Sequence, residues 1–254
     1  MIKLDLSKQS ILVTGASDGI GREIALFLMK MDARVAVHYH QNQTAAANLV
    51  EQFPATGSKI FKADFFNPSD IQELWQKVLL EFGEIDAIVL NAGVFLKQPI
   101  NDPIMDWFSI WKKTMAINLD AAAMLTKLGI DHFKTRGEGR LIYIGSRAVF
   151  RGETEEYLAY AASKGGLVSL GRSVARSFGK MNIKSFILSP GFTKTKMAEQ
   201  FIVDHGEEKI LKELSLNQLT LPEDISPLVG LMCSGLMDHA TGATIDVNAG
   251  SHIR

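Results

Sequence analysis

Tyr160 and Lys164 are the side chains whose types and spacing most clearly suggest chemistry. They lie four residues apart in Tyr160-Ala161-Ala162-Ser163-Lys164, and this spacing places both on one face of a helix. A free tyrosine titrates near pH 10, so alone it is a poor base at neutral pH. A neighbouring ammonium favours the phenolate, and we expect Lys164 to lower the pKa of Tyr160. The pair is predicted to exchange a proton with a substrate oxygen.

Ser146 follows an apolar strand and precedes Tyr160 by fourteen residues. From there its hydroxyl is expected to hold a substrate oxygen where negative charge develops. The alternative is a half-buried tyrosine beside an exposed helical lysine, which is the commoner fate of such a pair. The serine at the strand end argues for the chemical interpretation.

A glycine-containing turn, Thr14–Gly21, connects an apolar strand to an amphipathic helix. Gly15 permits the tight turn, Gly19 lets the backbone approach a pyrophosphate, and Gly21 lets the helix pack close to the sheet. The phosphates would lie at the positive end of the helix. The spacing is GxxxGxG rather than GxGxxG, and such a turn can also be a simple connection between a strand and a helix.

Two further segments are predicted to join this cofactor site from the same edge of the sheet. Asp64 ends the third strand and is expected to accept a hydrogen bond from an adenine amino group, while Asn91-Ala92-Gly93 follows the fourth strand and allows close passage of a ribose. Both segments are also common turn formers. Their joint placement favours the binding site.

The end of the second strand distinguishes the two nicotinamide cofactors. An acid there accepts from the ribose 2′-hydroxyl of NAD and repels the phosphate of NADP. Tyr39 and His40 stand at this place and no carboxylate does, which favours NADP(H). NAD(H) stays open, because no Arg or Lys is present either and Asp18 puts a negative charge in the glycine turn.

Short apolar runs alternate with segments of helical periodicity, which predicts an α/β fold: one Rossmann-type, doubly wound parallel sheet of about seven strands with helices on both faces. No linker or repeat divides the chain, so residues 1–254 are expected to form a single domain. Residues 192–218 are charged and helix-leaning after a strand end, and are predicted to be a substrate lid or a surface helix pair. The expected strands are Ser10–Thr14, Arg34–His38, Lys59–Lys62, Ala87–Leu90, Arg140–Ile144, Lys184–Leu188 and Thr244–Val247.

Composition argues against several classes of partner. The net charge is −1, from 27 basic and 28 acidic residues, without the charge runs that attract nucleic acid or membranes. The single cysteine, Cys233, excludes an intrachain disulfide, and the N-terminus lacks the apolar run of a signal peptide, so a cytoplasmic location is expected. Of the six histidines only His38 and His40 are close together, and they lack a third ligand, so no metal site is predicted.

These motifs together resemble the short-chain dehydrogenase/reductase family over essentially the whole chain. The resemblance implies that Tyr160 is the acid/base, that Ser146 positions the carbonyl, and that Lys164 lowers the tyrosine pKa and binds the nicotinamide ribose. It also implies that Asn118 holds a water in a proton relay. The expected cofactor contacts are Gly15, Ser17, Asp18, Gly19, Ile20, Gly21, Tyr39, His40, Asp64, Phe65, Asn91, Ala92, Gly93, Tyr160, Lys164, Pro190, Gly191 and Thr193, with Thr195 as a further candidate.

The expected activity is an oxidoreductase acting on a carbonyl/alcohol pair, with a 3-oxoacyl thioester as the first substrate class. A sugar, a steroid or another small alcohol is the alternative, and a non-catalytic nicotinamide sensor is an alternative of another class. Apolar helical faces at 103–135 and 157–178 predict a homotetramer or homodimer. Phe95, Leu96, Val149, Phe150 and Met197 are candidates for an apolar pocket, and Arg147 and Arg151 for contact with an acidic group.

Overall fold

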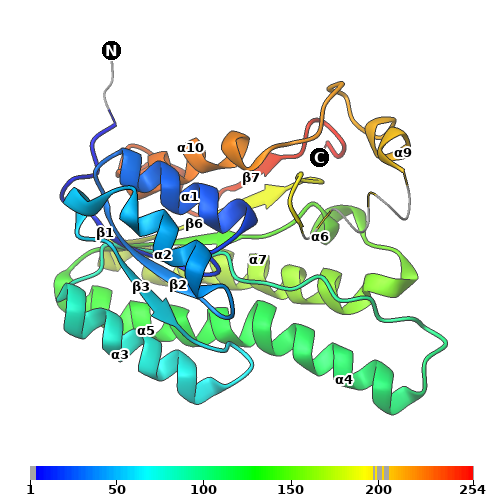
Figure 1. The fold of residues 1–254 in the computed structure, drawn as a ribbon, viewed down its shortest axis with the longest axis horizontal. Helices are drawn as coiled ribbons and strands as arrows, with labels where there is room; N and C mark the ends of the chain where they lie inside the picture. The colour runs from blue at the N-terminus through cyan, green and yellow to red at the C-terminus, as the bar shows by residue number, and fades with distance from the viewer. Residues whose placement is uncertain (1–3, 197, 199–201, 203–205, 254) are drawn as a thin grey trace.

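A single parallel sheet of seven strands, in the order β3-β2-β1-β4-β5-β6-β7, forms the centre of the protein (Figure 1). The computed structural model describes residues 4–196, 198, 202 and 206–253. Every expected strand is present, with ends that shift by at most two residues. The strands are β1 (Ser10–Val13), β2 (Arg34–Tyr39), β3 (Lys59–Lys62), β4 (Ala87–Leu90), β5 (Gly139–Ile144), β6 (Ile183–Pro190) and β7 (Thr244–Val247).

Helices cover both faces of this sheet, as expected for a doubly wound fold (Figure 1). Helices α1, α2 and α10 lie on one face, and α3, α4, α5 and α7 lie on the other. The bounds are α1 (Gly19–Lys30), α2 (Gln43–Glu51), α3 (Pro68–Phe82), α4 (Ile104–Met115), α5 (Ala121–Arg136), α6 (Ala148–Arg151), α7 (Leu158–Phe178), α9 (Glu207–Leu211) and α10 (Pro222–Cys233).

The strands are apolar on both faces because each face is covered. In β1, Ile11 and Val13 pack with α1 and α10, whereas Leu12 between them packs on the opposite side with α3 and α5. Successive side chains of a strand point to opposite faces, so a continuous run of apolar residues fills both layers.

The strand order reverses between β1 and β4, which are neighbours in the sheet. The Thr14 hydroxyl donates to the Val89 carbonyl at 3.1 Å and accepts from the amides of Asn91 and Ala92 at 2.9 and 3.0 Å. Ligands of open α/β sheets bind at such a reversal, beyond the carboxyl ends of the strands. The predicted cofactor residues therefore converge where the topology favours a ligand.

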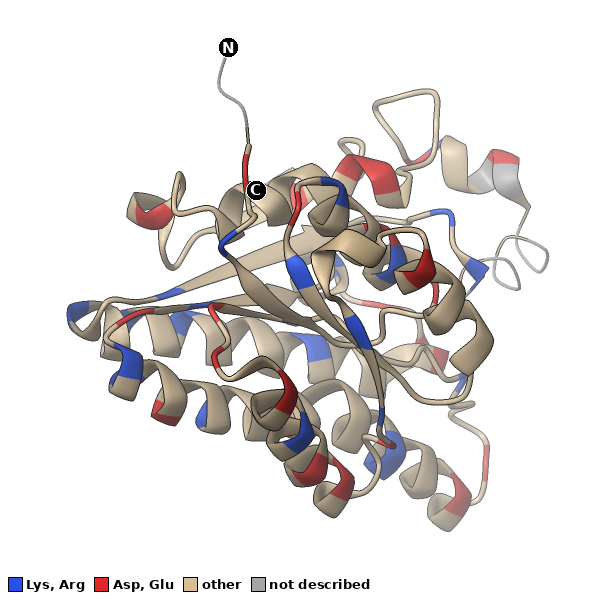
Figure 2. Cartoon of the chain, turned by 60° about the vertical axis from the view of Figure 1, so that its left-hand side comes forward, with Lys and Arg blue, Asp and Glu red and all other residues tan. Residues whose placement is uncertain are grey.

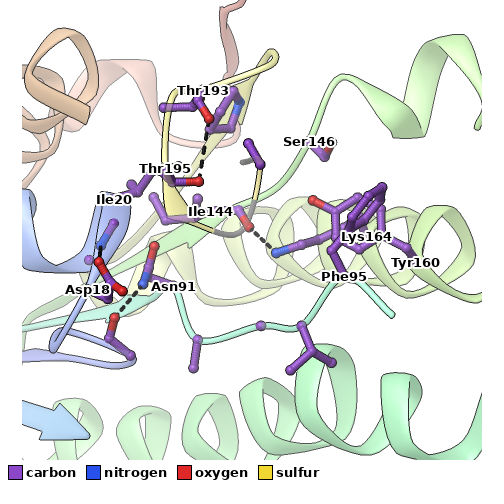
Figure 3. Close-up of a pocket in the computed structure, with 18 of the residues that line it drawn as sticks. Asp18, Ile20, Asn91, Phe95, Ile144, Ser146, Tyr160, Lys164, Thr193 and Thr195 are labelled. Atoms are coloured by element: carbon purple, nitrogen blue, oxygen red, sulfur yellow. Dashed lines mark hydrogen bonds between the residues drawn. The ribbon is translucent and has the colours of Figure 1, made fainter. Parts of the chain in front are cut away.

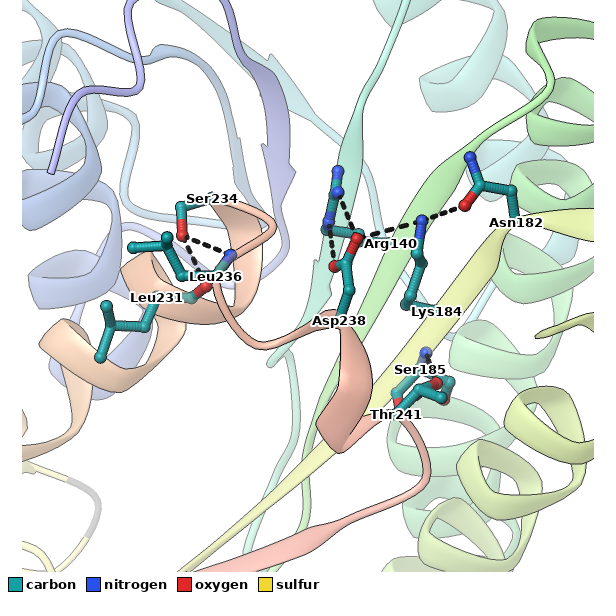
Figure 4. A network of polar contacts seen from close by, with 9 residues as sticks. All are labelled: Arg140, Asn182, Lys184, Ser185, Leu231, Ser234, Leu236, Asp238 and Thr241. Carbon is teal, nitrogen blue, oxygen red and sulfur yellow. Dashed lines mark hydrogen bonds and ion pairs between the residues drawn. The ribbon is translucent and has the colours of Figure 1, made fainter.

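The opposite, amino-terminal edge of the sheet holds an ion-pair network (Figure 4). Arg140 at the start of β5 donates to both carboxylate oxygens of Asp238, at 3.0 and 2.9 Å, and Lys184 of β6 lies 3.1 Å from the same carboxylate. These contacts lower the pKa of Asp238 against the effect of its burial. The network joins the last turn before β7 to strands β5 and β6, far from the ligand edge.

Positive and negative side chains are interspersed over the helices (Figure 2). Within the described part of the chain, no helix is both long and apolar enough to span a membrane. Helix α4 exposes Ile104, Met105 and Phe108 to solvent. This apolar surface agrees with the predicted contact between subunits, which stays a prediction.

Candidate active site

A cavity of about 810 Å³ opens at the carboxyl edge of the sheet. Figure 3 shows Asp18, Ile20 and Asn91 at one end and Ser146, Tyr160 and Lys164 at the other. Such a volume lies within the range of small-molecule sites. The expected contacts that line it are Gly15, Ser17, Asp18, Gly19, Ile20, Gly21, His40, Asp64, Phe65, Asn91, Ala92, Gly93, Ser146, Tyr160, Lys164, Pro190, Gly191, Thr193 and Thr195.

The glycine turn has the tight geometry that its sequence predicts. Gly15 has φ +64°, and a Cβ on Gly21 would lie 2.3 Å from both the Gly15 carbonyl oxygen and the Asn91 amide nitrogen. The Asn91 side chain donates to the carbonyl oxygens of Thr14 and Gly15 at 2.9 and 3.2 Å. Asn91 therefore fixes the turn, and the helix α1 begins directly against it with its N–H groups toward the cavity edge. This cradle fits a dinucleotide pyrophosphate.

Asp18 begins α1 as its N-cap. Its Oδ1 accepts from the Gly19 amide at 2.7 Å, and its Oδ2 lies 3.6 Å from the Lys196 ammonium. The carboxylate thus stabilises the helix start, while Lys196 offsets part of its negative charge. The sequence suggested that Asp18 would repel a bound phosphate, and this arrangement reduces that repulsion.

His38 is a structural member of the cofactor site that sequence analysis missed. Its Nδ1 accepts from the Gly15 amide at 2.9 Å, its Nε2 lies 3.2 Å from the Ala63 carbonyl oxygen, and its ring stacks on Phe65 with centroids 4.1 Å apart. An acceptor at Nδ1 leaves the proton on Nε2, so the ring is neutral. Burial lowers the pKa of His38 to about 4, in agreement with that neutral form. Successive side chains of a strand point to opposite faces, and this alternation could have placed His38, rather than Tyr39, at the site.

Tyr39 does not lie at the cavity, which corrects one expected contact. Its side chain is buried in the core on the face of α1 and α2. Tyr39 is the last residue of β2, and alternation turns it away from the face to which His38 and His40 point. His40 does line the cavity and lies 3.6 Å from the Asp64 carboxylate.

Tyr160 lies at the far end of the cavity, at the start of α7. The Ser146 hydroxyl lies close enough to the phenol to favour its charged form, and Phe95 packs edge-on against the tyrosine ring at a centroid distance of 4.8 Å. Burial raises the pKa of Tyr160 to about 12 and outweighs the opposite effect of the Ser146 contact. Without cofactor, the phenol is therefore protonated at neutral pH.

Lys164 is buried below Tyr160, with its ammonium 5.9 Å from the centre of the tyrosine ring. Its Nζ donates to the Ile144 carbonyl oxygen at 2.8 Å, which directs the side chain toward the end of β5. Burial lowers the pKa of Lys164 to about 8. In the protein alone, the pKa of Tyr160 is raised rather than lowered as expected, and Lys164 is not among the groups that shift it.

Asn118 lies in a π-helical segment, Ala116–Asp120, between α4 and α5, and it does not line the cavity. Its Oδ1 accepts from the Val94 amide at 2.7 Å, and its Nδ2 lies 3.0 Å from the Val94 carbonyl oxygen and 3.1 Å from the Ser163 hydroxyl. Its carboxamide therefore fixes the loop after β4 at Val94. The side chain is engaged with the protein itself, so a direct hold on a water stays a prediction.

Residues 192–218 form one wall of the cavity through Phe192, Thr193, Ile210 and Glu213, among others. Met197 lies outside the described residues, so its expected role in an apolar pocket has no structural counterpart here. Phe95 lines the cavity, whereas Phe150 stacks on His252 away from it. No cluster of metal-ligating side chains occurs among the residues that the structure describes.

Comparison with known proteins places the chain among dehydrogenases and reductases. A family profile described as "Enoyl-(Acyl carrier protein) reductase" matches residues 15–252. Dehydrogenase/reductase SDR family member 4 of Homo sapiens is 32% identical over 98% of this chain and 89% of its own length. A 3-oxoacyl-[acyl-carrier-protein] reductase of Salmonella typhimurium is 29% identical over 95% of this chain and 96% of its own length.

Two solved structures share the fold. A 7α-hydroxysteroid dehydrogenase, complexed with NADH and 7-oxo glycochenodeoxycholic acid, is 26% identical with a TM-score of 0.88 over 98% of this chain and 96% of that one. A short chain dehydrogenase of Burkholderia cenocepacia in complex with NADP is 27% identical with a TM-score of 0.87 over 98% and 99% of the two chains. Both relatives hold a nicotinamide dinucleotide.

Proposed function

The chain belongs to the short-chain dehydrogenase/reductase family, and from this premise we propose that it interconverts a carbonyl and a secondary alcohol with Tyr160 as the acid/base. It is an oxidoreductase that uses a nicotinamide cofactor, which supplies or accepts the hydride when bound. The observation that carries the proposal is the convergence of Ser146, Tyr160 and the buried Lys164 at one end of the cavity.

In the direction of reduction, Tyr160 gives its proton to the carbonyl oxygen while Ser146 donates a hydrogen bond to the same oxygen. The raised pKa of Tyr160, about 12, keeps the proton on the phenol at neutral pH, as an acid requires. Lys164 uses one of its three ammonium protons on the Ile144 carbonyl. The other two are free for a ribose hydroxyl and for stabilising the phenolate that forms.

We favour NADP(H) over NAD(H). No carboxylate follows β2 at the cavity, where His40, Gln41 and Asn42 lie, and an acid at this place is the feature that repels the additional phosphate. A fluorescence titration is expected to give a lower dissociation constant for NADPH than for NADH. Tighter binding of NADH would overturn this preference.

For the substrate, a 3-oxoacyl thioester is supported by the likeness to the Salmonella reductase. A steroid, a sugar or another small alcohol is supported by the likeness to the hydroxysteroid dehydrogenase. Oxidation of NADPH and NADH should be followed with acetoacetyl thioesters, ketosteroids, ketoses and quinones. If only one of these classes is turned over, the same experiment assigns both the substrate class and the cofactor.

Tyr160→Phe tests the mechanism. Phenylalanine keeps the ring against Phe95 but removes the proton, so turnover is expected to fall by at least about 10²-fold. The dissociation constant for NADPH should stay within about two-fold of the wild type, which also separates loss of chemistry from loss of fold. Retained turnover in Tyr160→Phe would refute the proposed role.

Three further expectations accompany this function. We propose that residues 192–218 act as a substrate lid, since Glu213 connects this segment to Arg151 at 2.8 Å across the cavity mouth. We propose a homotetramer or homodimer formed through α4 and α7, and light scattering that gives a monomer mass would contradict it. A cytoplasmic location agrees with the single, buried Cys233.

A further inference from the structure

Arg147 is a buried cation without a hydrogen-bonded partner in the wall of the cavity. It directly follows Ser146, and only 7% of its side chain is exposed. Among the described residues, its guanidinium makes no hydrogen bond, and its Nη1 is fully buried without a partner. The nearest acid is Glu213, whose carboxylate lies 3.6 Å from Nη2. This distance is beyond a hydrogen bond.

Two other largely buried arginines, Arg140 and Arg136, have hydrogen-bonded partners. Arg140 donates twice to Asp238, and Arg136 donates to Glu84, to Asp86 and to the Ile85 carbonyl oxygen. A buried charge is costly unless it is paired and hydrogen-bonded. Arg147 departs from this rule next to a proposed catalytic residue, where uncompensated groups often serve function.

The surroundings of Arg147 extend to the reacting phenol. Arg147, Glu153 and Tyr160 all line the cavity, and the charge of Glu153 acts on both of the others. Burial and the neighbouring Arg151 lower the pKa of Arg147, and Glu213 and Glu153 offset only part of this effect. An anion arriving there would lie beside the carbonyl that Ser146 holds.

We propose that Arg147 binds a carboxylate of the substrate, so that the enzyme acts on small oxo acids and hydroxy acids. The inference rests on the carbonyl/alcohol activity proposed above, and it narrows the substrate class. A 3-oxoacyl thioester carries no ionised group beside its carbonyl, so it would leave Arg147 uncompensated.

A carboxylate fits this corner better than a phosphate dianion. Arg151 forms an ion pair with Glu213 at 2.8 Å and lies 3.8 Å from Glu153, so both acids lie within ion-pair distance of Arg151. Arg147 and Arg151 thus face the two carboxylates of Glu153 and Glu213, so a single carboxylate adds one negative charge to this corner, where a phosphate dianion adds two. Its two oxygens also suit the planar fork of a guanidinium.

The test compares acids with their neutral esters. The probes are 4-oxopentanoate, 5-oxohexanoate and phenylglyoxylate, each beside its methyl ester, with NADPH as reductant. The wild type is expected to prefer the acids in kcat/KM. In Arg147→Gln, kcat/KM for the acids should fall about 10- to 100-fold, while the esters change less than about two-fold. Arg147→Lys keeps the charge and should recover part of the loss.

Two controls keep the result interpretable. Arg151→Gln removes an arginine of the same helix that already has partners, and it should change the ratio of acid to ester turnover less than Arg147→Gln does. Arg147 makes no hydrogen bond within the described residues, and Glu213 keeps Arg151 as its closer partner, so Arg147→Gln should leave the thermal midpoint of the protein without substrate equal or higher. A lower midpoint in Arg147→Gln would mean that the arginine is structural and would overturn the proposal.

A binding measurement makes the inference independent of turnover. Calorimetric titration of phenylacetate into the enzyme saturated with NADPH should show binding that weakens at least about ten-fold in Arg147→Gln. Equal binding by both proteins, or none by the wild type, would refute the carboxylate site. This inference fails, while the proposed function stands, if three results occur together. The esters are reduced, Tyr160→Phe is inactive, and Arg147→Gln leaves the ratio of kcat/KM for acids to that for esters unchanged. Full activity of Tyr160→Phe would instead remove the proposed mechanism.

Discussion

His38 connects the stability of the protein to pH in a way that can be measured. In the folded state its ring is neutral, because Nδ1 accepts from Gly15 and burial lowers its pKa to about 4. In the unfolded chain the pKa returns to the ordinary value of 6.5. Between these two values the unfolded state binds a proton that the folded state does not, so stability is full above pH 6.5 and decreases as the pH falls toward 4.

The magnitude follows from the two pKa values. One pH unit of difference corresponds to about 1.4 kcal/mol, so His38 alone removes about 3 kcal/mol of stability by pH 4 and about 2 kcal/mol by pH 5. His38→Phe keeps the stacking on Phe65 but cannot titrate. It leaves the Gly15 amide and the Ala63 carbonyl without partners, which costs about 1–3 kcal/mol at pH 7.5.

The assay is urea unfolding of the wild type and of His38→Phe at pH 7.5 and pH 5.0, because the carboxylates common to both proteins cancel in the difference. The free-energy gap between the two proteins should shrink by about 2 kcal/mol at pH 5. A gap that is independent of pH would refute the neutral, buried imidazole. His38→Asn, whose amide reaches about as far as Nδ1, should accept from Gly15 and bind NADPH better than His38→Gln, whose amide reaches about as far as Nε2.

Three other substitutions test the cofactor cradle, the cofactor preference and the opposite edge of the sheet. Gly21→Ala places a methyl group 2.3 Å from the Gly15 carbonyl oxygen, and it should weaken NADPH binding at least about ten-fold in a fluorescence titration; an unchanged dissociation constant would contradict the cradle. His40→Glu introduces an acid after β2 and should shift the ratio of NADH to NADPH affinity toward NADH by about ten-fold or more, with His239→Glu, distant from the cavity, as control. Arg140→Gln removes two charged hydrogen bonds from Asp238, which keeps Lys184, and should lower the free energy of unfolding by about 1–3 kcal/mol, while kcat/KM stays unchanged, since the network lies at the edge opposite the cavity; equal unfolding midpoints in urea would show that the network is not stabilising.

Much of the fold could be predicted because each strand is buried on both faces. A run such as Ile11-Leu12-Val13 is apolar without interruption only where both layers are covered, which is typical of a parallel sheet. The ends were less predictable, because β6 extends to Pro190 through pairing with β7, and partners far along the chain decide such pairing. The π-helical segment around Asn118 left no sequence signal, since its five residues look like ordinary helix.

The parts of the site that depend on backbone conformation could be predicted. Those that depend on which way a side chain points were less predictable. Gly15 and Gly21 predict a tight turn directly from the sequence, and this turn is present in the structure. Tyr39 was placed at the cofactor because it is near the end of β2, but the two-residue alternation of a strand turns it into the core and brings His38 to the site instead. The structure also shows that Asn91 fixes the glycine turn, a role that its neighbours in the sequence do not reveal.

Tyr160, the proposed proton donor, and Lys164 are linked by burial more than by attraction. The same low-polarity surroundings raise the pKa of Tyr160 to about 12 and lower that of Lys164 to about 8, because each charged form is disfavoured there. In the protein without cofactor the phenol therefore holds its proton firmly, as the direction of reduction requires. Oxidation needs the opposite, a phenolate, and the positive charge of an oxidised nicotinamide is the addition that favours it. Activation of Tyr160 is thus coupled to cofactor binding: a rapid burst of alcohol oxidation should become faster with rising pH, whereas the reduction step should be nearly insensitive to pH between 6 and 8.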